Sequence, residues 1–158
     1  MKRIFFFAVL TALSFSVFAQ EKSVVGKWKL TKLNSQGVTF NIEDPAQMKS
    51  ELTKQFEASG QPVDSNMVNM VFNQLYLSLS TLTFDFGSDG KLLIDAKSED
   101  APKKEEENYT VDYTKGVITS KSKEKEQKIG FKFEGETLIL TVEDSPGKSS
   151  VLSFKKLK

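Results

Sequence analysis

The sequence predicts a mainly β protein: an eight-stranded antiparallel up-and-down barrel with a two-helix insertion between its first and second strands. Two observations lead to this prediction. Over most of the chain apolar side chains alternate with polar ones, in runs separated by Gly, Asn and Asp turns, as in half-buried strands. One segment, about residues 44–80, instead has apolar residues at the four-residue spacing of helices. A sheet made of so many hairpins avoids free edges by closing into a barrel.

The first 19 residues have the pattern of a secretory signal peptide. Lys2 and Arg3 precede an apolar stretch over residues 4–18, and the small residue Ala19 follows. This stretch is shorter than the roughly 20 residues that a membrane-spanning helix needs. We therefore expect residues 1–19 to be removed and residues 20–158 to form one exported domain, periplasmic or secreted.

The expected first mature residue is Gln20, whereas a bacterial lipoprotein has a lipid-bearing Cys at that position. The protein is therefore not expected to be a lipoprotein, and no stable membrane anchor is expected after signal cleavage.

Composition excludes several classes of function. Among its 158 residues the chain has 22 Lys and Arg, 21 Asp and Glu, and neither His nor Cys. Disulfides, Cys/His metal sites, Cys nucleophiles and Ser-His-Asp triads are therefore impossible, and we expect neither enzymatic activity nor a cofactor. The single arginine, Arg3, lies in the signal peptide. A nearly neutral mature chain without guanidinium groups is not expected to bind nucleic acid.

The first half of the mature chain begins with extended segments. Residues 26–33 alternate, with Trp28 and Leu30 on one side, and residues 38–42 alternate again after a turn. Asp44 then supplies a helix N-cap, with a proline at the first helical position and a glutamine at the third. This pattern predicts the start of the first helix.

The second helix is predicted to begin after Asp64, which can cap it. Its end is open, because Leu75, Leu77 and Leu79 continue the helical face and also alternate as a strand would.

From there on the two-residue period dominates. The segment 97–107 is charged and is predicted to be a loop, and 121–128 is predicted to be a solvated hairpin tip. The remaining strands are expected at 82–86, 92–96, 109–113, 117–118, 129–133, 138–142 and 151–157.

Four short motifs carry a resemblance to a known family. They are Gly26-Lys27-Trp28, Phe84-Asp85-Phe86 followed by a Gly-Ser-Asp-Gly turn, Tyr109-Thr110-Val111-Asp112, and Leu152-Ser153-Phe154-Lys155-Lys156. Together they resemble the lipocalin-like (calycin) domains of small secreted bacterial proteins of the Bacteroidetes type.

The resemblance implies a barrel that is closed at the end carrying Gly26 and Trp28. In lipocalins an arginine of the last strand lies across this tryptophan. Here Lys155 or Lys156 could supply the cation, and Lys155 is the residue we assign to the motif. The resemblance also implies the transport or sequestration of small apolar molecules.

The strand faces predicted to point inward are rich in aromatic residues, and the second helix adds an apolar surface. These side chains could line a ligand pocket. The alternative, that they merely fill the barrel, is favoured by the packing density of protein interiors. The candidates are Phe84, Phe86, Ile94, Tyr109, Tyr113, Phe131, Phe133, Leu140 and Phe154 on the strands, with Met70 and Tyr76 on the second helix.

Three carboxylates that lie close together in the sequence are candidate ligands for a metal ion. Asp85, Asp89 and Asp95 bracket one turn, but their spacing does not match an EF-hand loop, so no metal is expected.

Two functional hypotheses remain. The leading one is a secreted or periplasmic barrel that binds a small hydrophobic or amphipathic molecule. It predicts an internal cavity of about 300 Å³ or more. The alternative is a non-enzymatic interaction module with a solid core, whose partner is an envelope or host protein. It predicts a contiguous exposed apolar patch of several hundred Å².

Overall fold

The computed structural model describes residues 22–60, 64–97, 103–122 and 126–158, so the predicted signal peptide lies outside the described residues. Nine strands and two helices are present in the described part of the chain. Their bounds are β1 Gly26–Ser35, β2 Val38–Asn41, α1 Pro45–Ala58, α2 Ser65–Thr81, β3 Thr83–Phe86, β4 Lys91–Ala96, β5 Lys103–Asp112, β6 Val117–Lys121, β7 Glu126–Glu134, β8 Thr137–Ser145 and β9 Lys148–Lys156.

The sheet closes on itself. From β3 to β9 each strand pairs antiparallel with the next, and β1 pairs with both β3 and β9. Trp28 of β1 faces Phe84 on one side and Lys156 on the other. The predicted closed barrel of eight antiparallel strands is therefore confirmed, and it is formed by β1 and β3 to β9.

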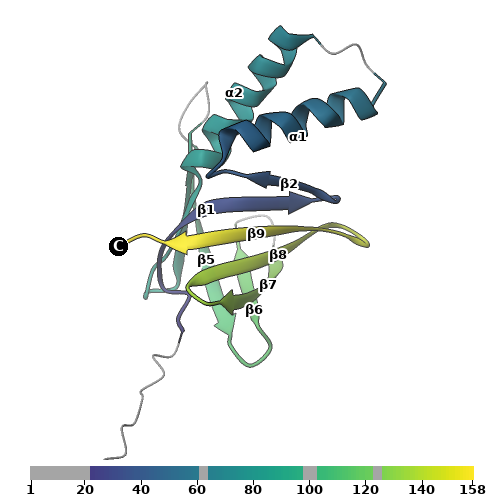
Figure 1. Ribbon diagram of the computed structural model, residues 1–158. Coiled ribbons are helices and arrows are strands. Elements are labelled where there is room, and N and C mark those ends of the chain that lie inside the picture. Colours follow the sequence, from purple (N-terminus) through teal and green to yellow (C-terminus); the bar gives the residue numbers. More distant parts are fainter. Residues whose placement is uncertain (1–21, 61–63, 98–102, 123–125) are drawn as a thin grey trace, which may run out of the picture.

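The ninth strand, β2, forms a hairpin with the second half of β1, where Lys32 faces Asn41 and Ser35 faces Val38. It lies on the same edge of β1 that β3 occupies further toward the N-terminus. The two helices follow β2 and precede β3, so they are inserted between the first and second barrel strands, as predicted. Figure 1 shows them packed together at one end of the molecule, next to β2.

Both helices begin with the predicted caps. The Asp44 carboxylate accepts a hydrogen bond from the Gln47 amide at 3.0 Å, and the Asp64 carboxylate accepts one from the Asn66 amide at 2.8 Å. The open question about the end of the second helix is also answered, because α2 remains helical up to Thr81. The alternation of leucines there arises from a helix that is apolar over a wide face.

One predicted loop is wrong in its second half. The charged segment 97–107 does not remain a loop throughout, because β5 already begins at Lys103. Cross-strand pairing with β4 supplies the reason: Asp95 faces Lys104, and Lys91 lies 3.2 Å from Glu106 across the same two strands. Opposite charges on neighbouring strands support pairing, which a pattern based on apolar alternation does not detect.

The barrel has two distinct ends. End A is where β1 begins and β9 ends, and end B is where β1 turns into β2 and where α2 passes into β3. The core is one cluster of buried side chains, and the inner side of α2 packs against it through Phe72, Leu75, Tyr76 and Leu79. The helices are therefore attached to end B.

Candidate functional site

End A is closed by the segment that precedes β1. Val24 is fully buried, and its carbonyl accepts a hydrogen bond of 2.6 Å from Trp28 Nε1. The Tyr113 hydroxyl accepts a hydrogen bond from the Val24 amide at 3.2 Å and lies 3.3 Å from Ser23 Oγ. This end of the barrel is a structural closure, as the resemblance to lipocalins implies for Gly26 and Trp28.

The cation over the tryptophan is Lys156, so the assignment of Lys155 is corrected. Lys156 Nζ lies 5.2 Å from the Trp28 ring centroid, whereas Lys155 Nζ lies 2.7 Å from a Glu43 oxygen on the outside of the barrel. Alternation explains the difference, since Phe154 points inward and the residue two positions on shares its face. Gly26 makes room for this side chain, because a Cβ there would stand 2.6 Å from Lys156 Cε.

Most of the predicted lining residues come together inside the barrel, where they contact one another. Phe84 packs against Phe154 with 4.9 Å between ring centroids, and Phe86 against Tyr109 with 5.1 Å. These four rings, together with the buried Leu140, belong to or pack on the central cluster. Ile94, Phe131 and Phe133 pack on the same cluster and are partly exposed.

The side chains from the helix and from the end of β5 are placed differently. Tyr76 is partly buried and stacks on Phe72 at 5.5 Å. Met70 is 57% exposed, and Tyr113 is 52% exposed and packs edge-on against Phe131 at the closed end A. Met70 is out of phase with the buried face of its helix, and Tyr113 follows the last residue of β5. Both are therefore removed from the candidate site.

At end B the inner face is apolar but incompletely covered. Ile94 and Phe84 of neighbouring strands, and Val142 and Leu152 from the other side of the barrel, share the inward face with buried residues. Each of them is only partly buried. Apolar surface on the inward face that keeps some contact with solvent is the property expected of a binding site.

The same end carries polar groups on the inward face that the sequence analysis missed. Glu107 Oε2 accepts a hydrogen bond from Ser120 Oγ, and Ser120 is only 3% exposed. Both residues alternate in phase with inward residues, Tyr109 on β5 and Ile118 on β6, which is the signal that could have identified them. We call Glu107 and Ser120 the β5–β6 polar pair.

A second polar group lies on the strands β8, β9 and β1. Ser150 Oγ lies 2.6 Å from Asp144 Oδ2 and 2.9 Å from Ser35 Oγ. Ser150 is buried and follows the inward row of Leu152 and Phe154. End B therefore combines apolar side chains with carboxylate and hydroxyl oxygens.

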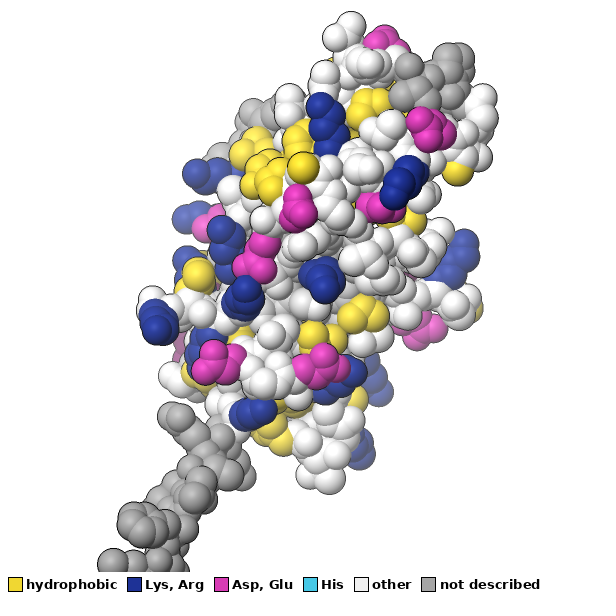
Figure 2. Space-filling view, viewed as in Figure 1, with side chains coloured by type: hydrophobic (Ala, Val, Ile, Leu, Met, Phe, Trp, Pro, Cys, Tyr) yellow, Lys and Arg dark blue, Asp and Glu magenta, His cyan; other side chains and the backbone are white. Residues whose placement is uncertain are grey.

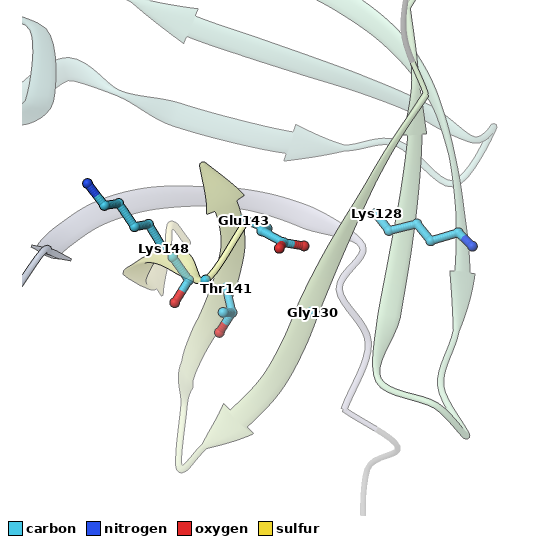
Figure 3. Close-up of a pocket in the computed structure, with 7 residues that line it drawn as sticks. Lys128, Gly130, Thr141, Glu143 and Lys148 are labelled. Atoms are coloured by element: carbon cyan, nitrogen blue, oxygen red, sulfur yellow. The ribbon is translucent and has the colours of Figure 1, made fainter. Parts of the chain in front are cut away.

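Two hollows in the described part of the chain lie outside the barrel. One, of about 430 Å³, is lined by Lys128, Gly130, Thr141, Glu143 and the β8–β9 turn (Figure 3). The other, of about 330 Å³, lies over Ile139, Ser153 and the Lys155–Glu43 ion pair. Their lining residues alternate with inward ones, so neither hollow is the internal cavity predicted for a ligand-binding barrel.

One tyrosine at the core, Tyr109, has a raised pKa. Burial raises the pKa of Tyr109 above 10.0, with smaller contributions from Tyr113, Asp89 and Asp85, and its hydroxyl donates a hydrogen bond of 2.8 Å to the Gly87 carbonyl. The described residues contain no group of three or more acidic side chains placed to hold a metal ion. Neither described helix has the length and apolar character needed to span a membrane.

The fold and the two ends define a lipocalin-like, calycin-type barrel. No known protein family and no curated protein matches the sequence. Among solved structures, the chain is similar to a DUF4847 family protein from Bacteroides vulgatus, with a TM-score of 0.50 and 10% identity over 84% of this chain and 94% of that one. A fatty-acid-binding protein from Echinococcus granulosus aligns with a TM-score of 0.40 and 18% identity, over 85% and 98% of the two chains. At these identities the likeness concerns the fold.

Proposed function

We propose that this chain binds a small hydrophobic or amphipathic molecule at end B of the barrel. The observation that supports this most directly is the partial exposure of inward apolar side chains there, including Ile94 and Leu152. Burying such a surface against a ligand tail is favourable by about 25 cal/mol per Å². Because Phe86, Tyr109 and Phe154 fill the barrel toward end A, the proposed ligand occupies only the half nearer the helices.

The helix α2 is part of the proposed site. Its side chains Phe72, Leu75 and Leu79 pack against the core from end B and are only partly buried. A ligand held between this helix and the inner face of β4 and β9 would complete their burial. Mixed apolar and polar surroundings favour an amphipathic molecule over a pure hydrocarbon.

The test is titration of the mature protein with N-phenyl-1-naphthylamine, an uncharged probe whose fluorescence rises in apolar surroundings. We expect saturable binding that Leu152→Gln weakens about tenfold, because a polar amide then replaces an apolar contact. The matched control is Val151→Gln, since Val151 lies on the opposite face of β9, opposite Thr141. Native mass spectrometry of the purified protein reports any molecule that is retained from the cell.

Two results would contradict the proposal. One is a probe that fails to saturate on a folded wild-type chain. The other is an equal effect of the substitutions at Leu152 and Val151, since this would place the probe on the outside. Circular dichroism and thermal unfolding verify that both variants fold.

The exposure of Met70 supports a second candidate, an interaction module whose helices contact another protein. Figure 2 shows hydrophobic side chains gathered over the two helices, and Met70 on α2 is 57% exposed. In that case Met70→Lys would abolish a complex with the partner and leave probe binding unchanged. Native mass spectra that contain only monomer, with no partner retained from the cell, would count against this candidate.

We further propose that the protein is exported, has no enzymatic activity and works by binding alone. The signal-like pattern of residues 1–19 supports export. Its test is the N-terminal sequence of the protein recovered from the producing cell, which should begin at Gln20.

A further inference from the structure

We propose that the ligand of end B carries a positively charged head group, such as an amine on an apolar tail, and not the carboxylate of a fatty acid. This inference rests on the proposed function and specifies the chemistry of the same site. It follows from the polar groups on the inward face and from the position of the nearby cations.

Glu107 is the central observation, because a charged side chain on the inward face of a barrel is costly unless it is paired. Its backbone faces the fully buried Leu92 on β4, and its carboxylate accepts a hydrogen bond from the buried Ser120. A carboxylate offers about four lone-pair positions, of which one hydroxyl uses one. Glu107 therefore keeps the capacity to accept hydrogen bonds from a ligand.

The group on the other side of the barrel has the same polarity. Asp144 lies 2.6 Å from Ser150, whose hydroxyl is also within 2.9 Å of Ser35. Two carboxylates thus lie at end B, the partly buried Glu107 on β5 and the exposed Asp144 on β8. A ligand carboxylate placed between them would be repelled, whereas an ammonium group would be attracted.

Five lysines have contacts with groups other than Glu107. Lys156 lies over Trp28 at end A, and ion pairs hold Lys91, Lys104 and Lys155 on the outer face. Lys49 is exposed, and its Nζ lies 6.0 Å from the ring centroid of Phe72 on α2. Lys148 pairs with Ser145, next to Asp144, so the expected preference rests on Glu107 and not on Asp144.

The experiment compares three ligands that share one tail, namely dodecylamine, dodecanol and dodecanoate, below their micelle concentrations. Each displaces N-phenyl-1-naphthylamine from the mature protein at neutral pH. We expect the amine to bind about tenfold more tightly than the acid, with the alcohol in between, because the amine gains a charge-assisted hydrogen bond. Raising the salt concentration should reduce this preference.

Glu107→Gln removes the charge and keeps the shape, so it should remove most of the preference for the amine over the acid. The matched control is Glu106→Gln, because Glu106 is the next residue, points outward and lies 3.2 Å from Lys91. This control removes the same charge from the outer face and should preserve the preference.

The outcomes separate the two proposals. If none of the three ligands displaces the probe, the proposed function fails together with this inference. If the alcohol binds but the acid binds as tightly as the amine, the binding function stands and the inference is overturned. Equal effects of the two glutamine variants would also overturn it. The wild-type comparison remains decisive even if Glu107→Gln does not fold.

Discussion

At the scale of single residues, the closure of end A depends on a glycine. Gly26 has φ of +123°, outside the range of ordinary side chains, and the Lys156 side chain crosses it to reach Trp28. We expect Gly26→Ala to lower the free energy of unfolding by about 2–3 kcal/mol, through backbone strain and loss of the cation–π contact. Urea unfolding monitored by the single tryptophan measures this.

The control for this substitution is Gly135→Ala. Gly135 also has a positive φ, of +60°, but nothing lies within 4 Å of a Cβ built there. Gly135→Ala should therefore lower the free energy of unfolding by less than Gly26→Ala does. Equal losses in the two variants would show that the crossing of Lys156 over Gly26 has no energetic importance.

Tyr109 makes the stability of the folded protein depend on pH, and its buried environment fixes the sign of that dependence. Burial raises the pKa of its phenol above 10.0 in the folded protein. The stability linked to this group is thus present below its unfolded pKa and is lost as pH rises through the folded one. Tyr109→Phe should be about 1 kcal/mol less stable near neutral pH, since it loses the hydrogen bond to Gly87.

The difference between wild type and Tyr109→Phe should then shrink in strongly alkaline solution. Urea midpoints of both proteins over a series of alkaline pH values measure it. A difference that stayed constant would mean that Tyr109 has the same pKa in the folded and unfolded chains.

At the scale of elements, the free edge of β2 is covered by one side chain of α1. Gln47 Oε1 accepts a hydrogen bond from the Asn41 amide at 3.2 Å, and its Nε2 donates one of 3.3 Å to the Thr39 carbonyl. An uncovered strand edge is a template for association with other chains. Gln47→Ala should cost about 1–2 kcal/mol and increase self-association at high concentration.

Light scattering and thermal unfolding would detect both effects. Gln55→Ala is the matched control, because Gln55 is an exposed glutamine of the same helix. If both variants behave alike, the edge of β2 is protected by something other than Gln47.

The elements also show what sequence alone could predict. Caps at Asp44 and Asp64 and the alternating strands are local signals, and the structure confirms them. The start of β5 lies opposite β4, and cross-strand pairs such as Lys104 with Asp95 are visible only when the partner strand is known. Strand phase, extended past the apolar residues, would have selected Lys156 over Lys155.

The candidate site was partly predictable for the same reason. The inward aromatics, such as Phe86 and Phe154, follow from alternation, and the structure places both in the core. Glu107 and Ser120 share that alternation but are polar, so a search for apolar lining passes over them. Whether the rings line a cavity or fill the barrel depends on packing in three dimensions, which alternation does not encode.

At the scale of the whole molecule, the segment before β1 closes end A of the barrel. Val24 is buried. Its carbonyl accepts a hydrogen bond from the Trp28 indole, and its amide donates one to the Tyr113 hydroxyl. A mature chain that begins at Gly26 loses these contacts. Its free energy of unfolding should be about 2–4 kcal/mol lower than that of a chain beginning at Lys22, since one valine side chain and two hydrogen bonds are removed.

The same truncation should expose Trp28 to water at end A, so its fluorescence emission should shift to the red and become easier for acrylamide to quench. Binding of the apolar probe should persist in the folded fraction, because the proposed ligand site is at end B, on the inward face that carries Ile94 and Leu152. A truncated chain that lost the probe and kept its stability would show the opposite, namely that the ligand enters through end A beside Trp28.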